Sequence, residues 1–196
     1  MAPGPGQLTT DRRLAERAEL LELLRALSFE RRRVVLASGK ESDFFIDCKQ
    51  AILTAEGHAL VGALLGAALE TLPTPVTAVA GVELGGCPLA SAVSMASVRA
   101  GVPLDAIYVR KEAKSHGSQR LIEGGTRLSP GASVALLEDV VTTGGSTLAA
   151  AAKLREAGFA IAGVVALVDR LEGGREAIVA AGLAFDALYT RADFIA

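Results

Sequence analysis

Residues 134–158, VALLEDVVTTGGSTLAAAAKLREAG, hold the pattern that decides the fold of this chain. An apolar run at 134–137 ends in two adjacent carboxylates, Glu138 and Asp139, and a turn rich in hydroxyl groups and glycine follows at 142–147. The alanine-rich segment after the turn has helical spacing, so the stretch predicts a strand, a turn and a helix. Glycines let a backbone approach an anion closely, and the N–H groups and dipole of a helix start favour negative charge. The turn is therefore predicted to form a phosphate-binding cup.

The two carboxylates must serve another part of the same ligand, because they would repel a phosphate. Their natural partners are sugar hydroxyl groups or a hydrated Mg²⁺ ion. The stretch thus indicates a ligand with a phosphate, a polyol and a metal ion, as a phosphorylated ribose has. The alternative is an ordinary strand–turn–helix unit with a polar turn. Neither the dinucleotide motif GxGxxG nor the P-loop motif GxxxxGK followed by Ser or Thr occurs in the chain.

Composition and charge exclude several classes of protein. The 196 residues fit one domain, and with 51% hydrophobic but only 4% aromatic residues we expect an aliphatic core. A net charge of −2 lacks the basic footprint of a nucleic-acid-binding protein. Cys48 and Cys87 have no metal-ligand spacing and predict reduced thiols in the cytoplasm. No signal peptide is expected, and the longest apolar run, residues 59–69, is too short to span a membrane.

Apolar strands alternate with helices along most of the chain, which predicts an α/β fold. We expect residues 1–10 to be disordered and residues 11–196 to form a single domain. The expected helices cover residues 11–27, 55–72, 88–99, 146–157 and 174–180, and the expected strands cover residues 34–36, 44–47, 76–80, 105–109, 134–137, 161–168 and 185–189. This alternation is typical of a mostly parallel central sheet flanked by helices, which binds ligands at the carboxyl ends of its strands.

One charged segment, residues 110–117 with the sequence RKEAKSHG, breaks the alternation. It contains four basic-type side chains, those of Arg110, Lys111, Lys114 and His116. The segment follows an expected strand, so it starts at the ligand edge, and the nearby glycines suit a mobile lid. Its cations would suit a polyanionic leaving group. The alternative is a solvated surface segment, and the other histidine, His58, receives no role.

The spacing of this segment and the cup resembles the type I phosphoribosyltransferase family, and orotate phosphoribosyltransferases in particular. RKEAKSHG stands about 28 residues before EDVVTTGGS at 138–146. Three further stretches resemble that family: residues 38–47, SGKESDFFID; residues 81–90, GVELGGCPLA; and residues 169–174, DRLEGG. The resemblance implies the type I phosphoribosyltransferase fold, with a mobile lid loop and a small N-terminal hood.

The resemblance also implies the site residues. The catalytic residues would be Lys114, His116, Arg110 and Lys111. Phosphoribosyl pyrophosphate would be bound by these four together with Glu138, Asp139, Val140, Val141, Thr142, Thr143, Gly144, Gly145 and Ser146. Orotate would be bound by Thr142, Arg170, Phe44 and Phe45. No protein residue would be a metal ligand, because Mg²⁺ would be held mainly by substrate and water. The family forms homodimers in which each lid reaches the neighbouring site, and the same is expected here.

The implied reaction moves a 5-phosphoribosyl group from phosphoribosyl pyrophosphate to orotate and releases pyrophosphate, a step of UMP biosynthesis. Orotate is an anion, and Arg170 can meet its carboxylate with two parallel hydrogen bonds. The alternative for Arg170 is a surface ion pair with Asp169 or Glu172. Two other functions stay open: transfer to a purine or to uracil, and a non-catalytic regulator that senses phosphoribosyl pyrophosphate. The orotate-like lid argues against the first, and the retained lid cations argue against the second.

Two positions depart from the family pattern. Some members have a lysine just before the N-terminal Ser-Gly, where this chain has Ala37. Some have a lysine in the pyrophosphate-facing loop, where this chain has Gly85. Gly85 and Gly86 can still offer backbone N–H donors, so we expect the activity to persist without these lysine contacts.

Overall fold

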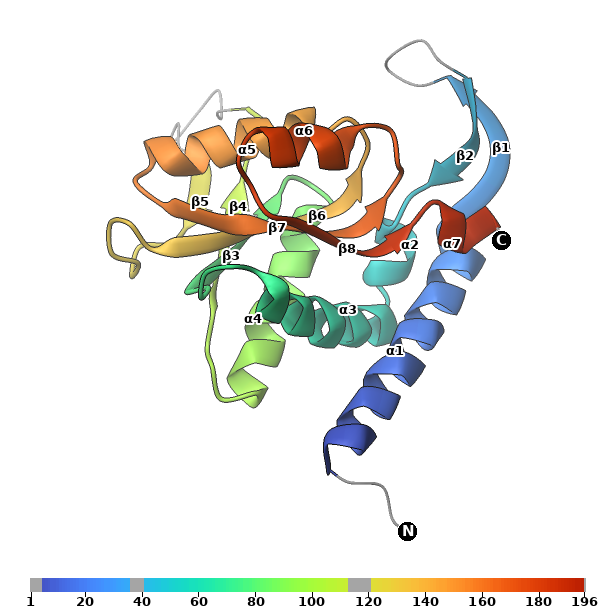
Figure 1. Cartoon of the computed structure of the whole chain (residues 1–196), viewed down its shortest axis with the longest axis horizontal. Coiled ribbons are helices and arrows are strands. Elements are labelled where there is room, and N and C mark those ends of the chain that lie inside the picture. Colours follow the sequence, from blue (N-terminus) through green and yellow to red (C-terminus); the bar gives the residue numbers. More distant parts are fainter. Residues whose placement is uncertain (1–4, 36–40, 113–120, 196) are drawn as a thin grey trace.

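The computed structural model describes residues 5–35, 41–112 and 121–195. Its centre is a six-stranded sheet with the strand order β5-β4-β3-β6-β7-β8 (Figure 1). The strands are β3 (Ala78–Val82), β4 (Asp105–Val109), β5 (Ile122–Gly124), β6 (Ser133–Val141), β7 (Ala160–Asp169) and β8 (Phe185–Thr190). Five of them run parallel, and only β5 pairs antiparallel, with β4. The predicted α/β fold with a mostly parallel sheet is confirmed.

Helices cover both faces of this sheet, as Figure 1 shows. The longer helices are α1 (Pro5–Leu27), α3 (Ala55–Ala68), α4 (Gly86–Arg99), α5 (Gly145–Glu156) and α6 (Gly174–Ala180). One apolar core joins the sheet to α1, α3 and α4, and a second core on the opposite face joins it to α5 and α6. Both cores are built mainly from Ala, Val, Leu and Ile. Successive residues of a strand point to opposite faces of the sheet, so each strand contributes side chains to both cores. The aliphatic core expected from the composition is therefore present on both faces.

The direction of the chain across the sheet changes between β3 and β6. From β3 the chain goes to β4 and β5 on one side, and then returns to β6, β7 and β8 on the other side. In open parallel sheets such a switch point separates the loops that leave the carboxyl ends of the two strands, and ligands bind between them. The fold therefore locates a ligand site beside the ends of β3 and β6.

A two-stranded hairpin precedes the sheet and forms the hood. It consists of β1 (Phe29–Val35) and β2 (Glu41–Ile46), which pair antiparallel. The short helix α2 (Lys49–Ile52) follows it, and the C-terminal helix α7 (Ala192–Ile195) lies near it (Figure 1). Three aromatic rings join the hairpin to α7: the Phe44 centroid is 5.1 Å from that of Phe29 and 5.7 Å from that of Phe194.

Several boundaries differ from those expected. The first helix begins at Pro5 and not at residue 11, and residues 1–4 lie outside the described part. The expected disorder of residues 1–10 stays a prediction. The strand expected at 34–36 begins at Phe29 in the structure. The charged residues 30–33 interrupt the apolar pattern, so the start of this strand was not predicted. The short elements α2, β5 and α7 were not predicted, since three or four residues carry too little periodicity. Among the described residues, no helix is both long and apolar enough to cross a bilayer.

Candidate active site

The predicted site residues follow the carboxyl ends of neighbouring parallel strands. Arg110 follows β4, Thr142 follows β6 and Arg170 follows β7. The loop after β3, which begins at Glu83, lies between the first two. Parallel strands end at the same edge of a sheet, so these loops share one side of the molecule. Lys114 and His116 lie outside the described residues.

The predicted phosphate cup is the turn between β6 and α5. Gly144 has a φ of 79° and caps the helix, a conformation that favours glycine. Thr143, Gly145 and Ser146 are exposed, so the first N–H groups of α5 are open to solvent. A helix start of this kind is a ready site for an anion. The geometry therefore fits a phosphate group, as the sequence predicted.

The two adjacent carboxylates face opposite sides of the sheet, as neighbouring residues of a strand do. Glu138 is 4% exposed and faces α5, where it accepts hydrogen bonds from Thr147 Oγ1 at 2.9 Å and from Ser146 Oγ at 3.3 Å. Burial raises the pKa of Glu138 to about 7 against these two hydrogen bonds, which lower it. Its predicted contact with ribose stays a prediction, because in this structure its carboxylate points to the helix that carries the cup.

Asp139 is half-buried and lies on the other face, against the loop after β3. A Cβ atom added at Gly85 would lie 2.0 Å from Asp139 Oδ2, so the carboxylate occupies the space beside that glycine. Burial raises the pKa of Asp139, and the nearby ammonium group of Lys49 opposes the rise. The absence of a side chain at Gly85 therefore leaves the space that the Asp139 carboxylate occupies.

Lys49 is a charged neighbour of the site that the sequence analysis missed. It lies at the start of α2 and forms an ion pair with Asp47, which also accepts a hydrogen bond from Gln50 Nε2 at 3.1 Å. The adjacent Cys48 is fully buried, with its Sγ 3.8 Å from the carbonyl oxygen of Asp139. The sequence signal was the Asp-Cys-Lys run directly after a strand, which points to an ion pair but not to its neighbour Asp139.

Arg170 lies beside the cup and is not on the surface. Its side chain is about one-tenth exposed, its Nη2 donates to the carbonyl oxygen of Phe44 at 3.3 Å, and its backbone N–H donates to the carbonyl oxygen of Val141. A Cβ added at Gly174, in the same turn, would lie 2.5 Å from the carbonyl oxygen of Thr142, so the turn packs closely against the cup. Thr142 and Arg170, both predicted for orotate, are therefore brought together.

The ion pair considered for Arg170 is present, although it is buried. Arg170 Nη2 is 2.8 Å from Glu172 Oε1, and the two side chains are 10% and 20% exposed. Asp169, the other partner considered, is fully buried. It accepts hydrogen bonds from Arg175 Nε at 3.3 Å and from the backbone N–H of Leu171 at 2.9 Å. Arg170 thus has a carboxylate partner within the site, and a ligand carboxylate would have to share or replace that partner.

The two phenylalanines predicted for orotate are separated, because they are neighbours on β2 and point to opposite faces. Phe44 is fully buried in the aromatic cluster of the hood, and the guanidinium of Arg170 lies 5.5 Å from its ring centroid. Phe45 is half-buried, and Arg32 lies 3.9 Å from its ring centroid. Phe44 therefore reaches the site through Arg170, while Phe45 faces away from Phe44. Their roles toward orotate stay predictions.

The two lid cations in the described part extend from the end of β4. Arg110 is half-buried with its Nη1 4.0 Å from Glu123 Oε1, and Lys111 is exposed. In the described ranges, no group of three or more His, Cys, Asp or Glu residues is arranged to hold a metal ion. The expected role of Mg²⁺ as a substrate-bound ion is not tested by that observation.

Comparisons with known proteins agree with this geometry. Residues 51–178 match the phosphoribosyl transferase domain family. A Sorangium cellulosum protein named orotate phosphoribosyltransferase is 67% identical over 181 residues, which are 92% of this chain and 94% of that protein. Its namesake from Synechocystis sp. is 45% identical over 177 residues, 90% of this chain and 87% of that protein.

Solved structures give the same result. Orotate phosphoribosyltransferase of Mycobacterium tuberculosis H37Rv in complex with Fe(III) dicitrate superimposes with a TM-score of 0.78 at 41% identity, covering 91% of this chain and 98% of that chain. The structure of that enzyme with 5-phospho-alpha-D-ribosyl 1-diphosphate has a TM-score of 0.73 at 34% identity, with 92% of each chain covered. The sheet, the cup and these similarities together show that the chain belongs to the phosphoribosyltransferase family, and within it to the orotate phosphoribosyltransferases.

Proposed function

We propose that this chain transfers the 5-phosphoribosyl group of phosphoribosyl pyrophosphate to orotate, giving orotidine 5′-phosphate and pyrophosphate. The observation that carries the proposal is the order of charges along the sheet edge. Cations follow β4, the carboxylate pair and the cup belong to β6 and its turn, and Arg170 follows β7. A leaving pyrophosphate and an incoming anionic base must lie on opposite sides of the ribose, and this order offers a cation on each side of the carboxylates.

The residues can carry the displacement by electrostatics and positioning. Breaking the bond from C1 to pyrophosphate builds positive charge on the ribose ring and negative charge on the leaving group. Preorganised charges stabilise such a transition state strongly. We propose that Asp139 faces the ribose hydroxyl groups, and that Arg110 and Lys111 stabilise the leaving group together with Lys114 and His116 of the lid.

Glu138 and the cup have a division of roles in this proposal. The exposed N–H groups and hydroxyls of residues 143–146 would anchor the 5′-phosphate. Glu138 accepts the hydroxyl protons of Ser146 and Thr147, so it fixes the orientation of the first turn of α5. With its pKa raised to about 7 by burial, the carboxyl group is largely neutral below that pH and adds little repulsion to a nearby phosphate.

Arg170 and Thr142 are proposed to select orotate. Orotate differs from uracil by a carboxylate, which Arg170 can bind in place of, or together with, Glu172. Phe44 helps to position the guanidinium, because its ring lies beside it and its carbonyl oxygen accepts a hydrogen bond from Arg170 Nη2. The buried position of Arg170 makes the interaction strong, because few water molecules screen it.

The described residues fit a Mg²⁺ ion that is held mainly by the substrate. Asp139 is a half-buried carboxylate whose pKa is raised by burial, so a cation beside it would be favourable. When bound, the ion would neutralise part of the charge on pyrophosphate. A water-rich shell is typical of Mg²⁺, which needs only one or two carboxylates of the protein.

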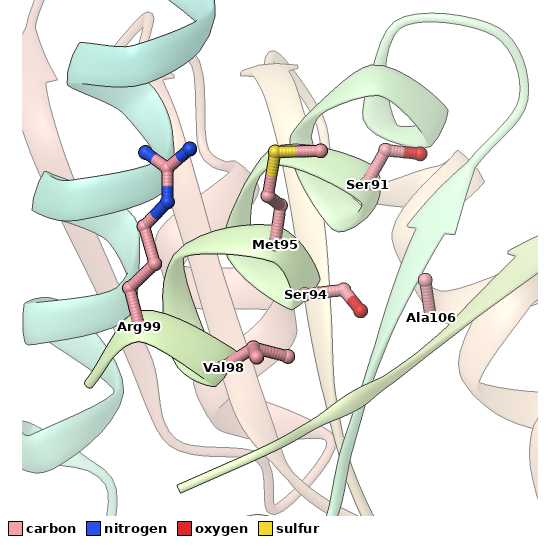
Figure 2. A pocket seen from close by; sticks show the side chains of 6 residues that line it. All are labelled: Ser91, Ser94, Met95, Val98, Arg99 and Ala106. Carbon is pink, nitrogen blue, oxygen red and sulfur yellow. The ribbon is translucent and has the colours of Figure 1, made fainter. Parts of the chain in front are cut away.

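We also propose a homodimer whose interface includes the outer face of α4. Met95 and Val98 on this helix are 61% and 63% exposed, and Val102 after it is 66% exposed. Met95 and Val98 line a shallow, open pocket of about 450 Å³, whose lining residues from α4 and β4 are shown in Figure 2: Ser91, Ser94, Met95, Val98, Arg99 and Ala106. Such a cluster of exposed apolar side chains favours a protein partner.

The interface has a direct test. In sedimentation velocity, Val98→Glu should give a monomer, while Val179→Glu on α6, which is also exposed, should leave the dimer intact. A shared site predicts that a mixture of the inactive variants Lys114→Ala and Asp139→Asn regains activity through hybrid dimers. Unchanged sedimentation of the Val98 variant would remove this face from the interface.

We further propose the cytoplasm as the compartment, on the basis of the two free, buried cysteines.

The proposed reaction is tested by one assay of pyrophosphate release. Phosphoribosyl pyrophosphate and Mg²⁺ are supplied with orotate, uracil, adenine or hypoxanthine in parallel. We expect rapid release with orotate alone and loss of release in excess chelator. Release with a purine but not with orotate would assign another base, and no release with any base would favour a binding protein.

A further inference from the structure

The backbone at the end of β4 is held by two charged side chains from other parts of the fold. Lys153 Nζ donates to the carbonyl oxygen of Arg110 at 2.9 Å and to that of Lys111 at 2.7 Å. Glu83 Oε2 accepts the backbone N–H of Lys111 at 3.0 Å. The backbone N–H of Arg110 donates to the carbonyl oxygen of Leu121 at 2.8 Å. Both peptide groups that carry the two cations are therefore fixed from outside their own strand.

The hydrogen-bond partners of Lys153 are unusual for a lysine at the end of a helix. It lies in the last turn of α5, where a lysine commonly meets the carbonyl groups of its own helix or points to water. Holding a lysine side chain in one conformation costs up to about 2 kcal/mol of rotamer entropy. Its ammonium nevertheless reaches a different element of the sheet and meets two consecutive carbonyl oxygens. The bonds therefore constrain the backbone of residues 110 and 111.

The helix that carries Lys153 also carries the phosphate cup. α5 begins at Gly145, within the cup, and ends beyond Lys153. A helix is a stiff rod, so Lys153 fixes the distance between its N-terminus and the backbone of Lys111. Glu83 completes the attachment from the loop after β3, which lies between β4 and β6 in the sheet order. The anchor of the 5′-phosphate and the backbone of the pyrophosphate cations are thus parts of one connected unit.

We propose that Lys153 and Glu83 are positioning residues that set the spacing between the 5′-phosphate site and the pyrophosphate site. This inference rests on the pyrophosphate role of Arg110 and Lys111 proposed above. Lys153 acts through the backbone of these residues and does not itself contact the substrate. A displacement of about 1 Å in such groups can lower the rate by a factor of about 100, because the developing charge is no longer matched.

The test compares Lys153→Met with Lys153→Arg in steady-state kinetics with both substrates varied. Methionine keeps the unbranched stem but removes the donors and the charge, while arginine keeps both. We expect Lys153→Met to lower kcat/KM for phosphoribosyl pyrophosphate by roughly 10- to 100-fold. The KM for orotate should change less than about twofold, and Lys153→Arg should recover most of the activity. Equal losses for both substrates would indicate general damage and overturn the proposal.

Direct binding measurements separate positioning from charge. Pyrophosphate should bind Lys153→Met about tenfold more weakly by isothermal titration calorimetry, while orotidine 5′-phosphate should bind with unchanged affinity. Arg155→Met is the matched control, because it removes an exposed cation from the same helix without touching residues 110 and 111. If Arg155→Met weakens pyrophosphate equally, the effect is one of net charge and the proposal fails.

Two further variants keep the result decisive. Lys111→Ala tests the underlying role: unchanged pyrophosphate binding in that variant would refute the proposed function of Lys111, independently of Lys153. Weakened binding in Lys111→Ala with normal binding in Lys153→Met would refute the positioning role alone. Should Lys153→Met fail to fold, Glu83→Ala removes the other attachment and is expected to show the same selective loss for pyrophosphate. Normal pyrophosphate binding and kinetics in Glu83→Ala would then overturn the proposal.

Discussion

Replacing Glu138 by glutamine should make the protein more stable at alkaline pH and change how its stability depends on pH. The carboxyl group is 4% exposed, and burial raises its pKa from 4.5 to about 7. A carboxyl group with a raised pKa binds its proton more tightly in the folded state than in the unfolded state. The free energy of unfolding therefore falls as the pH rises from 4.5 to about 7, and the loss is complete above that range. Glutamine cannot ionise, and its carbonyl oxygen can still accept the hydroxyl protons of Ser146 and Thr147.

The expected size follows from the shift in pKa. One pKa unit corresponds to about 1.4 kcal/mol, so a rise of the pKa from 4.5 to about 7 gives an upper limit of about 3 kcal/mol. Part of this loss is already present at pH 5, where an unfolded glutamate is mostly ionised. Between pH 5 and pH 9 we therefore expect the unfolding free energy of Glu138→Gln, relative to the unchanged protein, to rise by about 2–3 kcal/mol.

Urea unfolding followed by circular dichroism at pH 5, 6, 7, 8 and 9 measures this difference. Glu156→Gln is the matched control, because Glu156 is an exposed carboxylate near the end of the same helix α5. Its stability difference from the unchanged protein should stay nearly constant over the same pH range. A constant difference for Glu138→Gln as well would refute the reasoning, since it would mean that Glu138 is ionised at low pH despite its burial.

Three further predictions concern the ligand edge of the sheet. Arg170→Ala should raise the KM for orotate at least tenfold and leave that for phosphoribosyl pyrophosphate nearly unchanged, because the guanidinium is proposed to meet the orotate carboxylate; steady-state kinetics with an unchanged orotate constant would remove Arg170 from the site. Gly85→Ala should raise the KM for phosphoribosyl pyrophosphate about tenfold, because the new Cβ would lie 2.0 Å from Asp139 Oδ2 and the carboxylate must move; kinetics equal to those of the unchanged enzyme would show that Asp139 is not needed in its present place. Lys49→Met should move the acidic limb of the pH profile of kcat/KM to higher pH, because the ammonium holds the pKa of Asp139 down against the effect of burial; a profile that stays in place would mean that Asp139 does not govern that limb.

The sequence predicted the strand, turn and helix at the centre of the candidate site because their signal is local. The strand, the carboxylate pair, the glycine turn and the helix follow one another within residues 134–158, and each step has a backbone or charge requirement that a short pattern shows. Arg170 directly follows an apolar strand, but its role toward orotate was inferred from the family resemblance of residues 169–174 and stays a prediction. The alternation of neighbours on a strand could also have separated Glu138 from Asp139, and Phe44 from Phe45, before the structure was known.

The residues missed by the sequence analysis act across long separations. Lys153 contacts residues 42 and 43 positions earlier, and Glu83 contacts a residue 28 positions later. Lys49 approaches Asp139 only because the hood folds back onto the sheet. The sequence around these residues does not show which distant group each of them contacts, so their partners follow from the three-dimensional arrangement.

The antiparallel pairing of β4 with β5 has a consequence for how this enzyme family can vary. The two strands form a hairpin at the edge of the sheet, and the bond from the Arg110 N–H to the Leu121 carbonyl closes it at the base of the lid segment. The two ends of residues 111–120 are therefore joined before the segment itself contributes anything to the fold. Lengthening such a closed loop costs only about 0.6 kcal/mol for each doubling of its length. We therefore expect that relatives can differ in the length and sequence of this segment while the strand pairing of the sheet and the packing of both apolar cores stay the same.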